Sequence, residues 1–425
     1  MTHLPLSNER RRTLQLLGVT AFHWVLASRY AHAQSATAHG PAVPGPEQLR
    51  IGYQKSAVNL VILKQQGVLE KRFPGTRVSW LEFPAGPQLL EALSVGSLEF
   101  GLTGDSPPVF AQAAGKDLLY VGAEPPKPDS SALLVLKDSP LRTLADLKGR
   151  RIAVQKGSSA HYLLVKAVER AGLQWADIQP VYLAPADARA AFERKSVDAW
   201  AIWDPFYAAT ELAIQPRVLA TGRGGPVHPI FARCVAMPKG QALGAKRSWG
   251  AAPARLGNAA DGSLASQPGG KAAPAPLLVV ALLAKAPGLG VVTRLDWRGG
   301  DSLRTGKNWV NRPLASSNNS FYLAARPFVQ AHPQVLRVLF DELSRADRLA
   351  QEARKDAIKL IADFSGLDAG VVSLFIQRRP SSPVDVPGPT TVADQQRVAD
   401  AFFKLGLIPK PVNVADIVWR PVARS

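Results

Sequence analysis

Short apolar segments with strand character alternate with helical segments through most of this chain, and this alternation limits its fold more than any other feature. Predicted strands at residues 49–53, 77–83, 100–103 and 118–123 are separated by predicted helices at 59–66, 86–95 and 108–114. A strand–helix order repeated in this way is typical of a parallel, doubly wound sheet. The early part of the chain therefore predicts an α/β lobe.

A second series follows an apolar segment at 131–136, which we interpret as a crossover between lobes. Its predicted strands lie at 151–155, 180–183, 199–203 and 217–221, with helices at 143–147, 160–171, 187–195 and 206–214. After residue 314, a strand at 320–325 precedes helices within 327–363, 368–377 and 393–405. The fold class expected is α/β, with two doubly wound lobes joined by crossover strands and a ligand cleft at the carboxyl ends of the strands.

The N-terminus has the features of an export signal. Three arginines at 10–12 precede an apolar stretch at 14–27, and Ala31-His32-Ala33 has the small-x-small pattern of a cleavage site. The apolar stretch is too short to span a membrane. We expect cleavage near Ala33 and a periplasmic location; the sequence leaves Sec and twin-arginine export open.

These patterns divide the chain into six segments. We expect a signal peptide at 1–33, a disordered leader at 34–48, the first part of lobe 1 at 49–136, lobe 2 at 137–224, an atypical insertion at 225–313, and a return to lobe 1 with C-terminal helices at 314–425. The insertion has twelve Lys/Arg, three Asp and no Glu, with little periodicity. It is interpreted as a disordered surface insertion, a small extra domain, or a segment from a shifted reading frame.

The basic charge does not favour a nucleic-acid partner. The formal net charge is +18, but two thirds of it lies in the signal segment and in 225–313, outside the predicted lobes. Sulfur is scarce as well, because Cys234 and Met237 both lie in the insertion and Met1 in the signal. A protein made when sulfur is limiting fits this usage, and so does the composition of a GC-rich genome.

Two loops at strand-to-helix junctions are candidate anion sites. The first contains Gly104, Asp105 and Ser106, and the second contains Gly157, Ser158, Ser159 and His161. A helix start offers unpaired N–H groups and a positive dipole end, and serine adds hydroxyls. The alternative for each loop is ordinary helix capping. One such loop in each predicted lobe, with the amide of Gln54, predicts a cage of neutral donors around a small anion.

A third junction carries Trp203 and Asp204. Trp203 is either a wall of the ligand pocket or a core residue, and Asp204 either supports the pocket or caps the next helix. His161 is either a donor to the anion or a helix residue. No metal-ligand spacing, nucleotide-binding motif or nucleophile–base pair occurs in the sequence. We therefore expect a binding protein without catalysis, metal or cofactor.

Several of these motifs resemble the aliphatic sulfonate-binding proteins of ABC importers. The resemblance covers about 49–224 and 314–410, and it is carried by 51–55, 103–108, 122–126, 156–161, 198–206 and 318–324. It implies a type II binding-protein fold that closes on its ligand. By resemblance, Gln54 and the loops 104–106 and 157–159 meet the sulfonate, while Trp203 and Asp204 lie near the rest of the ligand. The segment 225–313 departs from the family.

The expected function is therefore capture of aliphatic sulfonates in the periplasm, by a monomer that delivers them to a membrane permease as a sulfur source. Taurine, nitrate or another small anion is the alternative ligand. An enzyme on the same fold, related to thiamine-pyrimidine synthesis, is the alternative class, but it calls for a cofactor site or a cysteine-rich motif. A LysR-type sensor domain calls for an N-terminal helix-turn-helix where this chain has an export signal.

Overall fold

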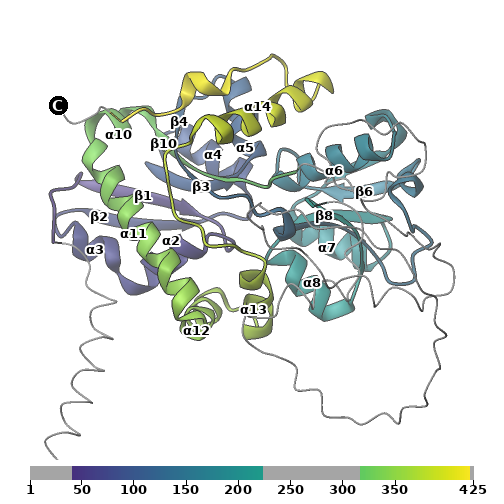
Figure 1. Ribbon diagram of the computed structural model, residues 1–425, viewed down its shortest axis with the longest axis horizontal. Helices are drawn as coiled ribbons and strands as arrows, with labels where there is room; N and C mark the ends of the chain where they lie inside the picture. Colours follow the sequence, from purple (N-terminus) through teal and green to yellow (C-terminus); the bar gives the residue numbers. More distant parts are fainter. Residues whose placement is uncertain (1–40, 224–315, 422–425) are drawn as a thin grey trace, which may run out of the picture. The chain divides into compact units, whose positions relative to one another are not determined.

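The computed structural model describes residues 41–223 and 316–421. The predicted signal peptide, the predicted insertion and residues 34–40 of the predicted leader lie outside the described residues. All described residues belong to one compact unit, which contains two five-stranded sheets (Figure 1). Each sheet with its helices forms one lobe.

The sheet of lobe 1 has the strand order β2-β1-β3-β10-β4. The strands are β1 Gln48–Tyr53, β2 Arg77–Glu82, β3 Phe100–Gly104, β4 Leu118–Glu124 and β10 Ser320–Ala325. Strands β2, β1 and β3 are parallel, whereas β10 runs antiparallel to both of its neighbours. The helices are α2 Val58–Gln66, α3 Val68–Arg72, α4 Gly86–Ser94, α5 Ser106–Ala113, α10 Arg326–Ala331, α11 Pro333–Glu352, α12 Arg354–Ser365, α13 Ala369–Gln377 and α14 Pro389–Lys404.

Side chains of alternating direction bury both faces of this sheet. On β10, Tyr322 and Ala324 pack into the cluster with α2 and α11, while Phe321 and Leu323 pack into the cluster with α4, α5 and α14. Because successive strand residues point to opposite faces, an apolar run such as 321–324 can serve two cores.

The sheet of lobe 2 has the order β7-β6-β8-β5-β9. Its strands are β5 Ser131–Val135, β6 Arg151–Val154, β7 Gln179–Tyr182, β8 Ala199–Trp203 and β9 Arg217–Thr221, and its helices are α6 Ser159–Arg170, α7 Pro185–Glu193 and α8 Phe206–Ile214. Four short 3₁₀ turns complete the described elements, η1 Pro128–Ser130, η2 Leu144–Leu147, η3 Trp175–Asp177 and η5 Val414–Ile417. Strand β5 was expected at the end of lobe 1, but it pairs antiparallel with β8 and β9. The chain has already crossed over at 125–130, so β5 belongs to the second sheet.

Each sheet thus receives one antiparallel strand from the crossover that enters it, β5 in lobe 2 and β10 in lobe 1. The two crossing segments lie side by side. The side-chain amide of Asn318 donates to the carbonyl of Lys127 over 3.0 Å, and the amide of Lys127 donates to Ser317. The predicted class, two α/β lobes joined by crossover strands, is confirmed, with mixed rather than purely parallel sheets.

The chain leaves the described part of lobe 2 at Arg223 and returns at Ser316, and these ends are neighbours. A β-carbon placed on Gly222 would lie 2.4 Å from the carbonyl oxygen of Ser316. Replacing 224–315 by a short glycine linker should therefore leave both sheets intact. A shorter connection costs less conformational entropy to close, so we expect stability unchanged or raised by about 2 kcal/mol. Calorimetric unfolding checks this; a collapsed or markedly lower transition would show that the segment is required for folding.

Candidate functional site

A cavity of about 60 Å³ lies where the two lobes meet. Its walls come from the carboxyl ends of β1, β3 and β8, the start of α6, both crossovers and the end of α13. A water-sized group needs about 10–15 Å³ of such space, so the cavity holds roughly four to six of them. The lining residues are Gln54, Ser56, Gly86, Leu102, Thr103, Gly104, Pro107, Lys127, Ser130, Ser158, Ser159, Trp203, Asp204, Asn318, Ser320, Phe375 and Arg379.

The second predicted loop supplies main-chain donors rather than hydroxyls. The hydroxyl of Ser158 already donates to the carbonyl of Gln155 over 2.8 Å, and Ser158 makes no capping hydrogen bond to α6. The first amides of a helix have no intrahelical acceptor, so those of Ser159 and Ala160 are the natural donors at this end. Gly157, with φ of 72°, makes the turn that precedes them.

The first predicted loop gives shape more than donors. Gly104 lines the cavity, but Asp105 and Ser106 are fully buried outside its lining, with the Ser106 hydroxyl donating to Asp105 over 2.9 Å. Pro107 and Pro108 have no N–H, so this helix start lacks two of the donors expected for an anion site. Burial raises the pKa of Asp105 to about 6, against the lowering effect of the hydroxyls of Ser106 and Ser159.

The two loops meet at Gly104 and Ser159. A β-carbon on Gly104 would lie 1.8 Å from the hydroxyl oxygen of Ser159. Lobe 1 and lobe 2 therefore come into contact directly beside the cavity, and a side chain at position 104 would displace the Ser159 hydroxyl.

The apolar wall and one carboxylate come from the third junction and its neighbours. Trp203 lines the cavity together with Leu102, Pro107 and Phe375. Asp204 also lines it, and its Oδ1 accepts the amide of Ala208, which caps α8, over 3.0 Å. Asp204 thus lies at the cavity and also binds the first turn of α8. Burial raises the pKa of Asp204 to about 7, although Arg378 acts to lower it.

His161 lies behind the second loop and does not line the cavity. Its Nδ1 accepts the amide of Gly157 over 3.2 Å, and its ring lies 5.1 Å from that of Phe402 and 5.3 Å from that of Trp175. Burial lowers the pKa of His161 to about 3, so the imidazole is neutral near pH 7. Its place in the structure is that of a support for the loop.

The low pKa of His161 predicts acid sensitivity. Because the unfolded histidine binds a proton below about pH 6.5 and the folded one does not, stability falls as pH drops. We expect wild type to lose about 3 kcal/mol between pH 6.5 and pH 4 relative to His161→Asn, whose amide oxygen can replace Nδ1. Asp105 and Asp204 titrate in the wild type and in the variant alike, so their contribution cancels when the two proteins are compared. Urea unfolding across this range checks it, and parallel profiles would contradict the buried, neutral histidine.

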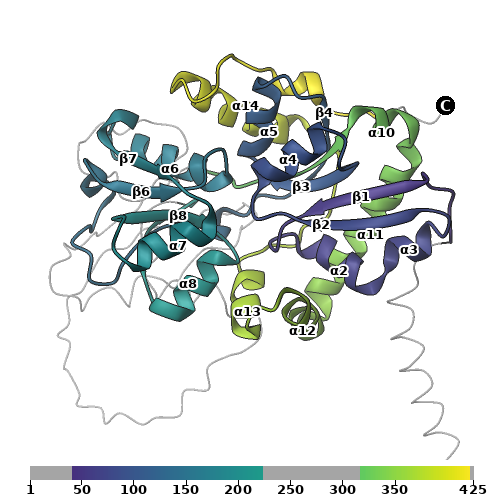
Figure 2. The same cartoon turned by 180° about the vertical axis from the view of Figure 1, so that it is seen from behind.

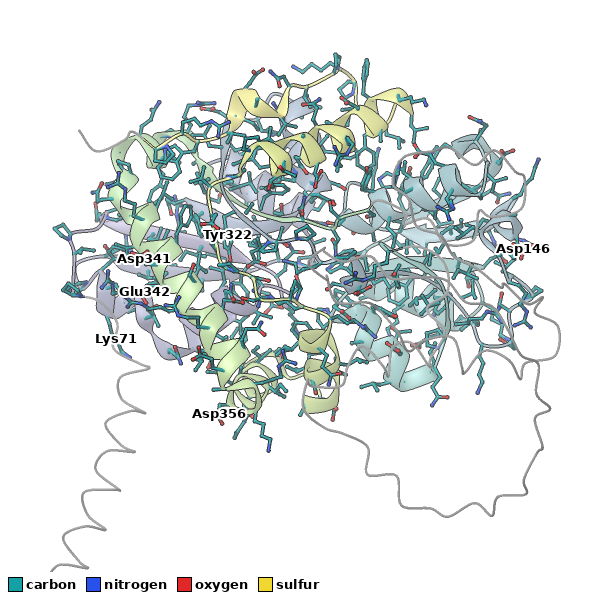
Figure 3. All side chains as sticks on the ribbon, viewed as in Figure 1. Lys71, Asp146, Tyr322, Asp341, Glu342 and Asp356 are labelled. Carbon is teal, nitrogen blue, oxygen red and sulfur yellow. The ribbon has the colours of Figure 1, made fainter. Side chains whose placement is uncertain are left out.

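Sequence reasoning missed a buried ionic cluster at the floor of the cavity. Lys127 binds Glu124 over 2.5 Å, and Arg379 binds Asp347 over 2.8 Å and Glu124 over 3.5 Å. Tyr322, labelled in Figure 3 on β10, donates to Glu124 over 2.8 Å. Burial acts to raise the pKa of Glu124, but the two cations hold it below its ordinary value. Two buried cations thus face two buried carboxylates.

Some missed residues had a sequence signal. Asn318 lies in one of the motifs that carried the resemblance, and Lys127 is a cation between two prolines at a crossover. Arg379 and Phe375 had none, because only tertiary packing brings the end of α13 to the cavity. Within residues 41–223 and 316–421, no group of three metal-ligating side chains occurs, and no helix is long and apolar enough to cross a membrane.

The fold and the cavity define a two-lobed solute-binding protein. The "NMT1/THI5 like" family model matches residues 78–223. An aliphatic sulfonate-binding protein of Escherichia coli K12 is 38% identical over 380 residues, which cover 89% of this chain and 91% of that protein. The chain belongs to the family of aliphatic sulfonate-binding proteins.

Solved structures agree with this assignment. The alkanesulfonate-binding protein SsuA from Xanthomonas axonopodis pv. citri, bound to MOPS, is 38% identical with a TM-score of 0.65, covering 89% of this chain and all of that one. A taurine-binding periplasmic protein of Escherichia coli is 31% identical over 38% of this chain and 49% of its own length. These relatives are binding proteins, not enzymes.

Proposed function

We propose that this protein is the periplasmic receptor of an ABC importer and captures aliphatic sulfonates. The observation that carries the proposal is the composition of the cavity. Its lining combines the start of α6 and the amides of Gln54 and Asn318 with the rings of Trp203 and Phe375. A permanently charged sulfonate with a short apolar chain matches both halves. Export through a signal cleaved near Ala33, a monomeric state and delivery to a membrane permease belong to the same proposal.

The charges at the cavity favour a monoanion. Lys127 and Arg379 line it, but each is paired with a buried carboxylate, Glu124 or Asp347. Asp204 adds a further acid, paired with Arg378. No surplus positive charge among these groups is left to compensate a second negative charge on the ligand. A sulfonate carries one charge and sulfate two, so sulfate should be disfavoured.

The roles of the predicted residues follow from their positions. Ligand contact is proposed for those that line the cavity, namely Gln54, Gly104, Ser158, Ser159, Trp203 and Asp204. A supporting role behind the two loops is proposed for Asp105, Ser106, Gly157 and His161.

Taurine is the second candidate ligand. The Oδ2 atom of Asp204 finds no hydrogen-bond partner among the described residues, and Asp204 lines the cavity. A carboxylate in that position would pair with the ammonium of an aminosulfonate. Comparing taurine with ethanesulfonate, two ligands of similar size, decides between an amine-selective and an alkyl-selective site.

Two substitutions of one residue test whether main-chain donors hold the anion. Ser159 is the first residue of α6, where proline is tolerated, and Ser158 has the extended backbone that a following proline requires (φ −87°, ψ 167°). Ser159→Pro removes the amide proton, whereas Ser159→Ala removes only the hydroxyl.

A hydrogen bond to a charged group contributes about 1.5–3 kcal/mol, so Ser159→Pro should weaken ethanesulfonate binding roughly 10–100-fold. Ser159→Ala should weaken it less. Titration calorimetry measures both. Wild-type affinity in a folded Ser159→Pro protein would remove this helix start from the binding site.

A further inference from the structure

Arg378 follows α13, a helix of the lobe 1 segment, and its side chain binds three residues of lobe 2. Its guanidinium donates to Oδ1 of Asp204 over 3.0 Å, forms an ion pair with Glu211, and lies 3.8 Å from the ring centroid of Tyr207. All three partners lie at or after the end of β8, in or next to α8. Both views of the ribbon place α13 between α12 and α8 (Figures 1 and 2).

The next residue is anchored to the other lobe. Arg379 binds Glu124 on β4 and Asp347 on α11, both in lobe 1. Two consecutive arginines at the end of α13 therefore hold opposite lobes. Since Arg379 is fixed by two buried carboxylates, Arg378 extends toward lobe 2 from a rigid base.

The contact made by Arg378 is buried and adjoins the cavity through Asp204. The side chain of Arg378 is 13% exposed and that of Asp204 is 3% exposed. Asp204 lines the cavity, so one carboxylate faces the ligand space and holds the arginine. Separating the lobes here would break the ion pairs of Arg378 with Asp204 and Glu211, so these pairs favour the arrangement in which the lobes touch.

Besides the meeting of Gly104 with Ser159, the lobes are joined near the cavity by packed rings. Phe110 of α5 and Phe402 of α14 pack against His161 of α6 at centroid distances of 6.2 and 5.1 Å. Such packing contributes to closure but does not touch the ligand space. Arg378, unlike these rings, is an ion-paired link between the lobes that includes a residue of the cavity lining, Asp204.

From these contacts we propose that Arg378 is a closure latch, which holds lobe 2 against α13 through Asp204 and Glu211 and thereby slows release of the bound ligand. It is a positioning residue, because it acts through Asp204. The ligand-release part rests on the proposed function, whereas the lobe-holding part does not.

The test separates these two parts. In a Cys234→Ser background, Val95→Cys in lobe 1 and Asp187→Cys in lobe 2 place spin labels on exposed positions of each lobe. Pulsed electron–electron double resonance then gives the distance between the two spin labels in the full chain without ligand. Stopped-flow tryptophan fluorescence gives the dissociation rate of ethanesulfonate.

Arg378→Gln should shift the distance distribution to longer values and speed release by roughly tenfold or more, with the association rate nearly unchanged. Arg378→Lys should recover part of both effects. The matched control is Arg189→Gln, which breaks the pair with Glu193 inside α7 and should behave as the parent. Unfolding midpoints of the ligand-free proteins check that a merely structural loss is not being measured.

An unchanged distance distribution in Arg378→Gln would overturn the latch, whether or not sulfonate binds. Should the parent bind no sulfonate, the proposed function fails while the distances still decide the latch. Should Arg378→Gln not fold, Glu211→Gln, whose side chain is 37% exposed, carries the test. An unchanged distance in that variant would overturn the proposal equally.

Discussion

Replacing Arg379 with alanine is expected to lower the free energy of unfolding by about 3–5 kcal/mol, because it leaves a buried charge cluster unbalanced. The Arg379 side chain is 5% exposed, and its partners Glu124 and Asp347 are 3% and 2% exposed. Without the arginine, Asp347 loses its cation and Glu124 keeps only Lys127. Urea unfolding at pH 7 measures the loss.

Arg397→Ala is the matched control for this experiment. That arginine pairs with Asp394 on the surface of α14 and is 66% exposed, so its loss should cost less than about 0.5 kcal/mol. If Arg379→Ala cost no more than the control, the cluster at the floor of the cavity would not be the stabilising network described above.

The second large effect is expected from Gly104→Ala. The added methyl would lie 1.8 Å from the Ser159 hydroxyl, so either Ser159 turns away and loses its hydrogen bond to Asp105 or the two loops move apart. We expect ethanesulfonate affinity to fall roughly 10–100-fold, the loss of one to two good contacts to a charged ligand. The unfolding transition should change little, because the strain acts between the loops. Titration calorimetry and thermal unfolding measure the two quantities.

A double variant makes this prediction specific. Ser159→Ala removes the oxygen that the methyl meets, leaving the Ser159 β-carbon 3.1 Å away. Gly104→Ala combined with Ser159→Ala should therefore bind more tightly than Gly104→Ala alone. Additive losses would mean that the two loops do not meet in the ligand-binding state.

The sequence predicted the strands and helices well because apolar alternation and glycine stops are local signals. The bounds of β3, β8 and α8, for example, differ from the predicted ones by a residue at most. Sheet order was less accessible. Strand β5 was assigned to the wrong side of the crossover because an apolar strand does not reveal which sheet it joins.

The site was predicted in part, for a similar reason. Residues at strand ends or in the turns that follow them, such as Gln54, Trp203 and Ser159, line the cavity because strand ends converge there. Arg379 could not be found, since it reaches the cavity from a C-terminal helix. The number of hydrogen-bond donors expected from the first loop was too high, because Pro107 and Pro108 have no amide proton.

The most direct test of the central claim is a calorimetric titration of the protein without residues 1–33, unfolded and refolded to remove bound ligand. The ligands are ethanesulfonate, a longer alkanesulfonate, taurine, sulfate and nitrate. The neutralised cations and the apolar wall predict tight binding of the alkanesulfonates and little binding of sulfate or nitrate. Binding of sulfate as tight as that of the alkanesulfonates, or no sulfonate binding by a folded sample, would contradict a cavity built for organic sulfonates.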